Sequence, residues 1–328
     1  MYSGGLKHRH GIVAIAAKLD WTSAICVSVS IGCLLPRSVP NATFRQKRLV
    51  EGGQIGLVSS DVLTGMRFST VRLTTGPRIH YAEYGNADGE PILFLHGWPD
   101  SWFSWSRVVP LLPQGLRAFM PDQRGFGDSE RPQAGYGIGQ FAADAVAFLD
   151  AVSVERATIV GHSFGSFVTR QVALTHPDRL RRMVLIGTAV SAASRVVREV
   201  QGLVRDLEDP VSVEFARDFQ ASTVYRPVPD SFFERIVAES LKLPARLWRD
   251  VIDQLLAYDD ATQLARIVTP TLLLWGEHDA LFAREDQESL VTAIPGARLR
   301  IYQETGHCPN WERPEDVAAD LHTFLRET

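Results

Sequence analysis

Apolar stretches of strand length alternate with amphipathic stretches of helix length from about residue 66 to the end of the chain. In one amphipathic stretch, Phe141, Ala145, Phe148, Leu149 and Val152 fall at positions i, i+4, i+7, i+8 and i+11, the spacing of one helix face. The pattern predicts strands over 68–73, 78–84, 91–95, 117–120, 158–160, 182–187, 271–275 and 298–302. It predicts helices over 102–112, 141–152, 164–175, 284–294 and 314–326. This alternation predicts an α/β fold with a mostly parallel β-sheet flanked by helices.

The alternation breaks between about residues 189 and 264, which show no strand pattern. Three helical patterns occur there, over 196–207, 232–237 and 247–255. An insertion that follows the C-terminal end of a parallel strand lies over the edge of the sheet where ligands bind in such folds. We therefore interpret 189–264 as a helical cap or lid inserted after the sixth strand. Extra helices at the periphery are the alternative.

The first 65 residues do not continue this alternation of strand and helix patterns. They contain seven Lys or Arg and only three Asp or Glu. Their apolar stretches are interrupted by Lys18 and Asp20, so none approaches the roughly 20 residues that a membrane span needs. We interpret this segment as a disordered leader or the product of an upstream start, and a secretory signal is the alternative. Strand patterning begins directly after Met66.

This pattern divides the chain into three parts: a leader over 1–65, a core formed by 66–188 and 265–328, and a cap over 189–264. The chain has 328 residues, of which 45% are hydrophobic and 22% charged, as in ordinary globular proteins. Its net charge of −4 gives no sign of nucleic acid or an anionic membrane as a partner. We expect a monomer or a homodimer.

Cysteine usage bears on the location of the protein. Cys26 and Cys33 lie in the leader, so the core contains only Cys308 and can form no internal disulfide. A cytoplasmic location is therefore expected. Export is the alternative if the leader is a signal segment.

The most informative stretch is Thr158-Ile159-Val160-Gly161-His162-Ser163-Phe164-Gly165. It contains G-x-S-x-G between a predicted strand and a predicted helix, the arrangement of a nucleophile elbow that exposes one serine hydroxyl. Side chains at Gly161 or Gly165 are expected to collide with the neighbouring strand or helix, since the serine sits in a strained turn. Ser163 is therefore the candidate nucleophile.

A serine hydroxyl needs a base to take its proton, and the base needs an acid to orient it. Both should follow later strands. Asp279 follows the predicted strand 271–275, and His307 follows the strand 298–302. The order Ser163, Asp279, His307 is the chain order typical of this arrangement. Glu277 and His278 are the nearby competitors and are expected to face solvent.

The reaction also requires donors for an oxyanion. The backbone N–H of Phe164, directly after the nucleophile, is one candidate. The second is the N–H of Trp98, in the loop after the predicted strand 91–95. His96 precedes Gly97 and His162 follows Gly161 near this site, and we expect both histidines to pack and hydrogen-bond behind the loops.

These motifs together resemble the α/β-hydrolase fold superfamily over residues 66–328. The matching stretches are His96-Gly97-Trp98-Pro99-Asp100-Ser101, 122–129, 161–165, 276–279 and Gly306-His307. The first loop and the position of the cap resemble epoxide hydrolases and haloalkane dehalogenases in particular. Those enzymes carry aspartate at the elbow, where this chain has Ser163. Because serine attacks acyl carbon, an epoxide or haloalkane substrate is disfavoured.

The sequence therefore predicts a serine hydrolase of carboxylic esters or lactones that works through an acyl-enzyme and uses no cofactor and no metal. The substrate is expected to be small, apolar and ester-like, with Trp102, Tyr225 and Trp248 as candidate pocket residues. Two enzymatic alternatives stay open, a carbon–carbon bond hydrolase acting on a diketone and a cofactor-free perhydrolase. An alternative of another class is a ligand-sensing receptor on the same fold.

Overall fold

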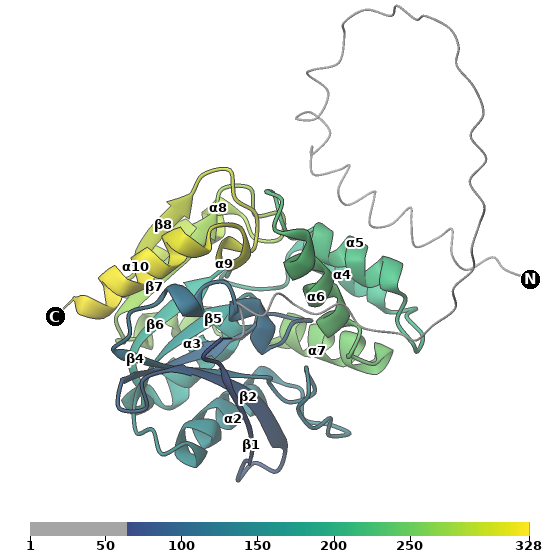
Figure 1. Cartoon of the computed structure of the whole chain (residues 1–328). Helices are drawn as coiled ribbons and strands as arrows, with labels where there is room; N and C mark the ends of the chain where they lie inside the picture. Colours follow the sequence, from purple (N-terminus) through teal and green to yellow (C-terminus); the bar gives the residue numbers. More distant parts are fainter. Residues whose placement is uncertain (1–63, 328) are drawn as a thin grey trace, which may run out of the picture.

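The computed structural model describes residues 64–327, which form one eight-stranded sheet (Figure 1). The order across the sheet is β1-β2-β4-β3-β5-β6-β7-β8. The strands are β1 (Arg67–Arg72), β2 (Arg78–Gly85), β3 (Glu90–Leu95), β4 (Leu116–Pro121), β5 (Ala157–His162), β6 (Leu180–Ile186), β7 (Thr271–Gly276) and β8 (Arg298–Tyr302). β2 is antiparallel to β1 and β4, and all other neighbours are parallel. The predicted α/β fold with a mostly parallel sheet is confirmed.

Helices connect the parallel strands and cover the sheet. They are α2 (Ile138–Ala151), α3 (Phe164–Thr175), α4 (Arg195–Val204), α5 (Val213–Ala221), α6 (Asp230–Ser240), α7 (Ala245–Ala257), α8 (Arg284–Ala293), α9 (Pro309–Glu312) and α10 (Pro314–Arg326). Short 3₁₀ segments are η2 (Trp102–Trp105), η3 (Val109–Leu111), η4 (Pro177–Arg179) and η5 (Ala261–Arg266). Most of the predicted strands and helices begin or end within three residues of the bounds in the structure.

The two faces of the sheet form two separate hydrophobic cores. Along β3, Leu93 and Leu95 join the core that contains α2 and α3, whereas Ile92 and Phe94 join the core that contains α10. This division follows from the period of two in a strand, which sends successive side chains to opposite faces. Because both faces are buried, the central strands are mostly apolar, as in residues 92–95 of β3.

One predicted element differs from the structure. The pattern over 102–112 predicts a single helix, but the chain forms η2 and η3 instead. Pro110 explains the difference, because it has no N–H for an α-helical hydrogen bond and its ring disfavours α-helical backbone at Val109. The N–H of Trp102 is also taken by Oδ1 of Asp122, at 2.8 Å, which fixes the start of η2 to the loop after β4.

Four helices, α4 to α7, lie between β6 and β7, where the sequence predicts the cap (Figure 1). The sequence patterns identified α4, α6 and α7 but missed α5. This helix has only nine residues, and its buried Phe215, Ala216 and Phe219 give too short a pattern to stand out. The start of α5 is marked in the sequence by an N-cap residue, Ser212, whose Oγ accepts a hydrogen bond from the N–H of Phe215.

The predicted leader lies outside the described residues, apart from Thr64 and Gly65. The three-part division of the chain at 65/66, 188/189 and 264/265 stays a prediction. None of the helices within residues 64–327 has both the length and the apolar character that crossing a membrane requires.

Candidate active site

Ser163 sits in the tight turn between β5 and α3. Its backbone angles are φ 49° and ψ −119°, in a region that non-glycine residues rarely adopt. Its N–H donates to the carbonyl of Ile186 at 2.8 Å, which ties the turn to β6. A Cβ at Gly161 would lie 2.3 Å from the carbonyl oxygen of Gly165, and one at Gly165 would lie 2.2 Å from that of Leu95. Both glycines are therefore required sterically, as the sequence predicted.

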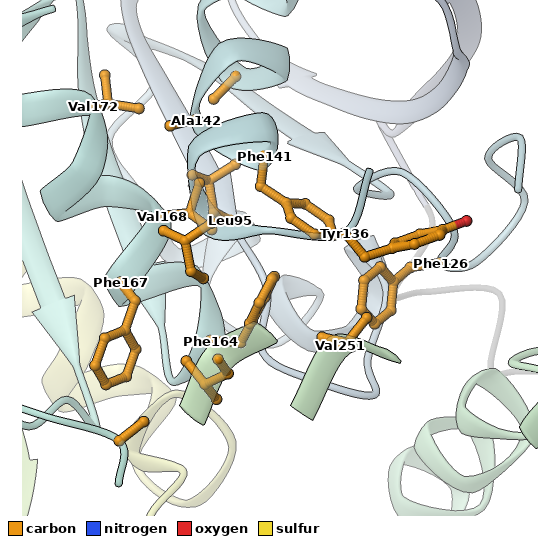
Figure 2. Close-up of a cluster of buried hydrophobic side chains, with 14 of the residues drawn as sticks. Leu95, Phe126, Tyr136, Phe141, Ala142, Phe164, Phe167, Val168, Val172 and Val251 are labelled. Carbon is orange, nitrogen blue, oxygen red and sulfur yellow. The ribbon is translucent and has the colours of Figure 1, made fainter. Parts of the chain in front are cut away.

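The residue after the candidate nucleophile anchors this turn in the core. Figure 2 shows Phe164 among the side chains contributed by α2 and α3. Its ring packs edge-on against Phe141, with ring centroids 4.8 Å apart, and lies 6.1 Å from Phe126. Phe164 is the first residue of α3, so its N–H has no acceptor within the helix. The packing fixes this amide beside Ser163.

The structure brings His307 and Asp279 together. His307 Nδ1 lies 2.8 Å from Asp279 Oδ2. The other carboxylate oxygen of Asp279 accepts from the N–H groups of Leu281 and Phe282, at 2.9 and 3.1 Å. The side chain of Asp279 is fully buried, and that of His307 is 2% exposed. On the opposite edge of the imidazole, Nε2 is buried and makes no hydrogen bond within the described residues.

The loop that carries Asp279 and the loop that carries His307 are in direct backbone contact. The N–H of His278 donates to Thr305 at 2.8 Å. A Cβ on Gly276 would lie 2.0 Å from the carbonyl oxygen of Gly306, so only glycine allows this approach. The N–H of His307 donates to the carbonyl of Thr223, in the insertion, at 2.9 Å. The position of the imidazole therefore depends on both the core and the insertion.

The competing residues on the loop after β7 point elsewhere. Glu277 and His278 are exposed, whereas the carboxyl group of Asp279 reaches His307. The ring of His278 stacks on Tyr225, with centroids 4.0 Å apart and planes 13° from parallel. The geometry thus favours Asp279 as the partner of His307.

A cavity that is open to solvent lies above these residues, has a volume of about 510 Å³ including the solvent at its mouth, and contains both Ser163 and His307 in its lining. The apolar wall comes largely from the insertion, through Val197 and Val200 of α4, Phe219 of α5, and Ile252 and Leu255 of α7. The polar and charged lining residues are Asp100, His162, Ser163, Gln220, Thr223 and His307. The helical insertion therefore forms one side of the cavity over the carboxyl ends of the strands.

The candidate oxyanion residues come from two segments next to Ser163, the loop after β3 and the start of α3. Trp98 lines the cavity, with its ring 5.1 Å from the rings of both Phe219 and Trp248. Phe164 is the first residue of α3, and its backbone N–H is the second candidate donor. Its side chain packs against Phe141 in the core. A Cβ at Gly97, next to Trp98, would lie 3.2 Å from Ser163 Cβ. This loop therefore runs directly beside the candidate nucleophile.

The three candidate pocket aromatics lie outside the cavity lining. Trp102 packs against Phe103 and Phe68, Tyr225 stacks on His278, and Trp248 lies behind Trp98. The aromatic side chains that do line the cavity are those of Trp98, Phe219, Phe282 and Trp311. Helical spacing alone cannot tell which side of a helix faces a cavity, because that depends on how the helix is placed on the sheet.

Two buried histidines support the loops around Ser163. His96 Nδ1 lies 2.8 Å from the carbonyl of Gly97, and its Nε2 accepts from the N–H of Gln123 at 3.0 Å. Burial lowers the pKa of His96 to about 4. Burial and the proximity of His307 also lower the pKa of His162 well below its usual range. Both rings are therefore neutral and structural at neutral pH.

His80, Asp122 and Asp128 are close enough to one another to hold a metal ion. His80 Nδ1 and the carboxylate oxygens of Asp122 and Asp128 are already paired with protein groups. Asp122 Oδ2 accepts from His80 Nδ1 and from the N–H of Asp128, at 2.8 and 2.9 Å, and Lys242 Nζ lies 2.9 Å from Asp128 Oδ1. This cluster is built as a hydrogen-bonded ion-pair network.

Comparison with known proteins agrees with this architecture. The family model described as alpha/beta hydrolase fold matches residues 90–314. The chain is 30% identical over 261 residues to 2-hydroxymuconate semialdehyde hydrolase of Pseudomonas sp. (strain CF600), covering 73% of this chain and 88% of the relative. It is 26% identical to Lipase 3 of Moraxella sp. (strain TA144), covering 79% and 84%. A solved hydrolase from Pseudomonas aeruginosa PA01 superposes with a TM-score of 0.70 at 27% identity, covering 79% of this chain and 98% of that one. This chain belongs to the alpha/beta hydrolase fold family.

Proposed function

We propose that the protein is a serine hydrolase that cleaves carboxylic esters or lactones, with Ser163 as nucleophile, His307 as base and Asp279 as its orienting acid. One observation carries the proposal. Asp279 holds His307 at Nδ1, and the buried Nε2, which makes no hydrogen bond within residues 64–327, belongs to a residue that lines the same cavity as Ser163. A neutral imidazole held in this way is prepared to accept a proton at Nε2.

The proposed reaction has two halves. Ser163 Oγ attacks the ester carbonyl carbon while His307 Nε2 takes the hydroxyl proton. The negative charge on the carbonyl oxygen is stabilised by the N–H groups of Trp98 and Phe164. His307 then passes the proton to the leaving alcohol as the carbon–oxygen bond breaks, which leaves an acyl-enzyme. Water attacks the acyl carbon in the same way, and the acid is released as Ser163 regains its proton.

The cavity argues for a neutral, mostly apolar substrate. Within residues 64–327 its lining contains no Arg or Lys, and one of its polar residues is the acid Asp100. One relative is named for its substrate, 2-hydroxymuconate semialdehyde, and that compound carries a carboxylate group. A carboxylate in the cavity described here would meet Asp100 without a compensating cation, and burying an unpaired charge is costly. An ester is therefore preferred over an anionic diketone.

Turnover of short p-nitrophenyl esters tests this function. Continuous release of p-nitrophenol over hundreds of turnovers is expected of a hydrolase. A ligand-sensing receptor would stop after about one equivalent, since it would keep the acyl group. A panel of aliphatic esters, lactones and a neutral diketone then identifies the bond that is cleaved. Faster cleavage of the diketone than of every ester would contradict the proposal. The proposed monomeric or homodimeric state and the cytoplasmic location stay predictions.

A further inference from the structure

Asp100 is a buried carboxyl group in the catalytic cavity that the proposed triad does not use. It is 2% exposed and lines the cavity together with Ser163 and His307. It lies in the loop after β3, two residues beyond Trp98, and its N–H donates to the carbonyl of Gly97 at 3.0 Å. The sequence motif contained this residue, but nothing in the pattern assigned it a role.

The carboxyl group and the side chain of Ser163 both lie beside Gly97. A Cβ built on Gly97 would lie 3.2 Å from Asp100 Oδ2, 3.2 Å from Ser163 Cβ and 3.0 Å from His162 Nδ1. The three groups therefore converge on one point next to the candidate nucleophile. A substrate whose carbonyl carbon is at Ser163 would bring its neighbouring atoms within reach of Asp100.

One oxygen of Asp100 is held firmly and the other is not. Oδ1 accepts from Gln220 Nε2 at 3.0 Å, and Gln220 also donates to Ser240 Oγ at 2.8 Å. These bonds tie Asp100 to α5 and α6 of the insertion. Among the residues that the structure describes, Oδ2 accepts only one long hydrogen bond, from Ser104 Oγ at 3.4 Å. Oδ2 thus retains capacity to accept a further hydrogen bond.

His162 presents a second acceptor toward the same place. Its Nε2 lies 3.2 Å from the carbonyl of His307, so Nε2 carries the proton and donates. Because the ring is neutral, Nδ1 is then a lone-pair acceptor. Nδ1 is buried, has no hydrogen-bond partner within the described residues and lies 3.9 Å from Asp100 Oδ2. When Asp100 is ionised, two acceptors therefore face each other, and no group within the described residues donates to both of them.

We propose that Asp100 is a specificity-determining residue that accepts a hydrogen bond from a hydroxyl group of the substrate one to three bonds from the scissile carbonyl. The preferred substrates are then esters of hydroxy acids with an apolar chain. A neutral hydroxyl fits better than an ammonium group, because His307 becomes positively charged during the reaction and would repel a cation. This inference rests on the proposed ester hydrolysis.

The charge on Asp100 gives a way to observe this contact. Burial raises the pKa of Asp100 to about 7, against the hydrogen bonds from Gln220 and Ser104. The ionisable groups around it are His307, His162, Glu239 and Cys308. Asp100 is therefore mainly protonated at pH 6 and mainly ionised at pH 8.5. An ionised carboxylate accepts a hydrogen bond from a hydroxyl more strongly than a neutral acid does.

The experiment compares methyl butanoate with the separate enantiomers of methyl 2-hydroxybutanoate and methyl 3-hydroxybutanoate. Hydrolysis is followed by acid release, and the quantity measured is the ratio of kcat/KM for each hydroxy ester to that for the plain ester. Both esters use the same nucleophile and the same base, so effects of pH that are common to the two substrates cancel in the ratio. At least one hydroxy ester is expected to be preferred by about tenfold at pH 8.5. That preference should fall severalfold at pH 6.

Variants separate a direct contact from a structural role. Asp100→Asn keeps the size of the side chain and removes the charge, so the preference should shrink and lose its dependence on pH. Asp100→Leu removes the acceptor, so the preference should disappear. Asp253→Asn is the matched control, because Asp253 is an exposed carboxylate on α7, bonded to Gln201. It should leave the ratio and its pH dependence unchanged.

The outcomes distinguish this inference from the proposed function. Hydrolysis of methyl butanoate with no preference for any hydroxy ester would overturn the role of Asp100 and leave ester hydrolysis standing. So would a preference that survives in Asp100→Asn with its pH dependence intact. If Asp100→Leu fails to fold, the pH dependence of the ratio in the unaltered protein and in Asp100→Asn still decides. Failure to hydrolyse every ester would contradict the proposed function itself.

Discussion

His307 Nδ1 lies 2.8 Å from Asp279 Oδ2, and both side chains are buried. The two N–H groups that bind Asp279 Oδ1 leave Oδ2 as the only carboxylate oxygen directed at the imidazole. In this arrangement the Asp279 carboxylate accepts a hydrogen bond from Nδ1–H, so Nε2 carries no proton and can act as the base in the proposed mechanism. This relationship selects Asp279 over the other acid on its loop.

Asp279→Asn tests that selection. The amide keeps the shape but removes the charge and can favour the wrong imidazole tautomer, so turnover of one p-nitrophenyl ester should fall by up to about 10⁴. Glu277→Gln is the matched control, because Glu277 is exposed on the same loop. Its turnover should stay within about twofold. If Glu277→Gln lost its turnover and Asp279→Asn kept it, the acid would have been assigned to the wrong residue.

Ser163→Ala should abolish ester hydrolysis and preserve the fold. The change removes only Oγ, which the proposed mechanism uses as the nucleophile, and leaves the backbone bond to Ile186 intact. Ser69→Ala, on the exposed face of β1, is the control. Turnover and the midpoint of thermal unfolding are the two measurements. Activity within tenfold of the unaltered protein would exclude Ser163 as the nucleophile.

Local geometry was enough to propose the candidate triad from the sequence. Ser163 could be proposed because the elbow needs glycines at fixed positions around it. Asp279 and His307 could be proposed because parallel strands end at the same edge of the sheet. Trp102, Tyr225 and Trp248 show the limit of such reasoning. Which face of a cap helix or loop lines the cavity depends on tertiary packing, which periodicity does not encode.

Asp100 is a residue whose contacts could not be predicted from the sequence. Its importance in the structure comes from Gln220, which lies 120 positions later on α5. The sequence pattern had missed α5 altogether, so the contact could not be anticipated. Pro110 also shows how one residue without an N–H divides an otherwise helical pattern into η2 and η3.

Gly165→Ala should destabilise the protein. The added Cβ would lie 2.2 Å from the carbonyl oxygen of Leu95, so β3 or the start of α3 must move, and we expect a loss of about 3 kcal/mol in the free energy of unfolding. Gly139→Ala on α2 is the control, because a Cβ there meets nothing within 4 Å. It should be neutral or stabilising by up to about 1 kcal/mol. Urea unfolding of both variants measures the difference, and equal stabilities would disprove the steric requirement at the elbow.

His80 should make stability depend on pH. Its hydrogen bond to Asp122 raises the pKa of His80 above its usual value near 6.5, against the effect of burial. The folded state therefore binds the proton more tightly than the unfolded state does. The resulting stabilisation is complete below about pH 6.5 and is lost as the pH rises through the higher folded value.

His80→Asn isolates this contribution, because the Asn side chain can still donate to Asp122 but does not titrate. Urea unfolding of both proteins at pH 5.5 and pH 8.5 gives the difference in free energy of unfolding at each pH. Other titrating groups are common to the two proteins, so their effects cancel in that difference. The advantage of His80 over Asn should be larger at pH 5.5 than at pH 8.5. An advantage that is constant, or that grows with pH, would mean that the proton on His80 is not what Asp122 stabilises.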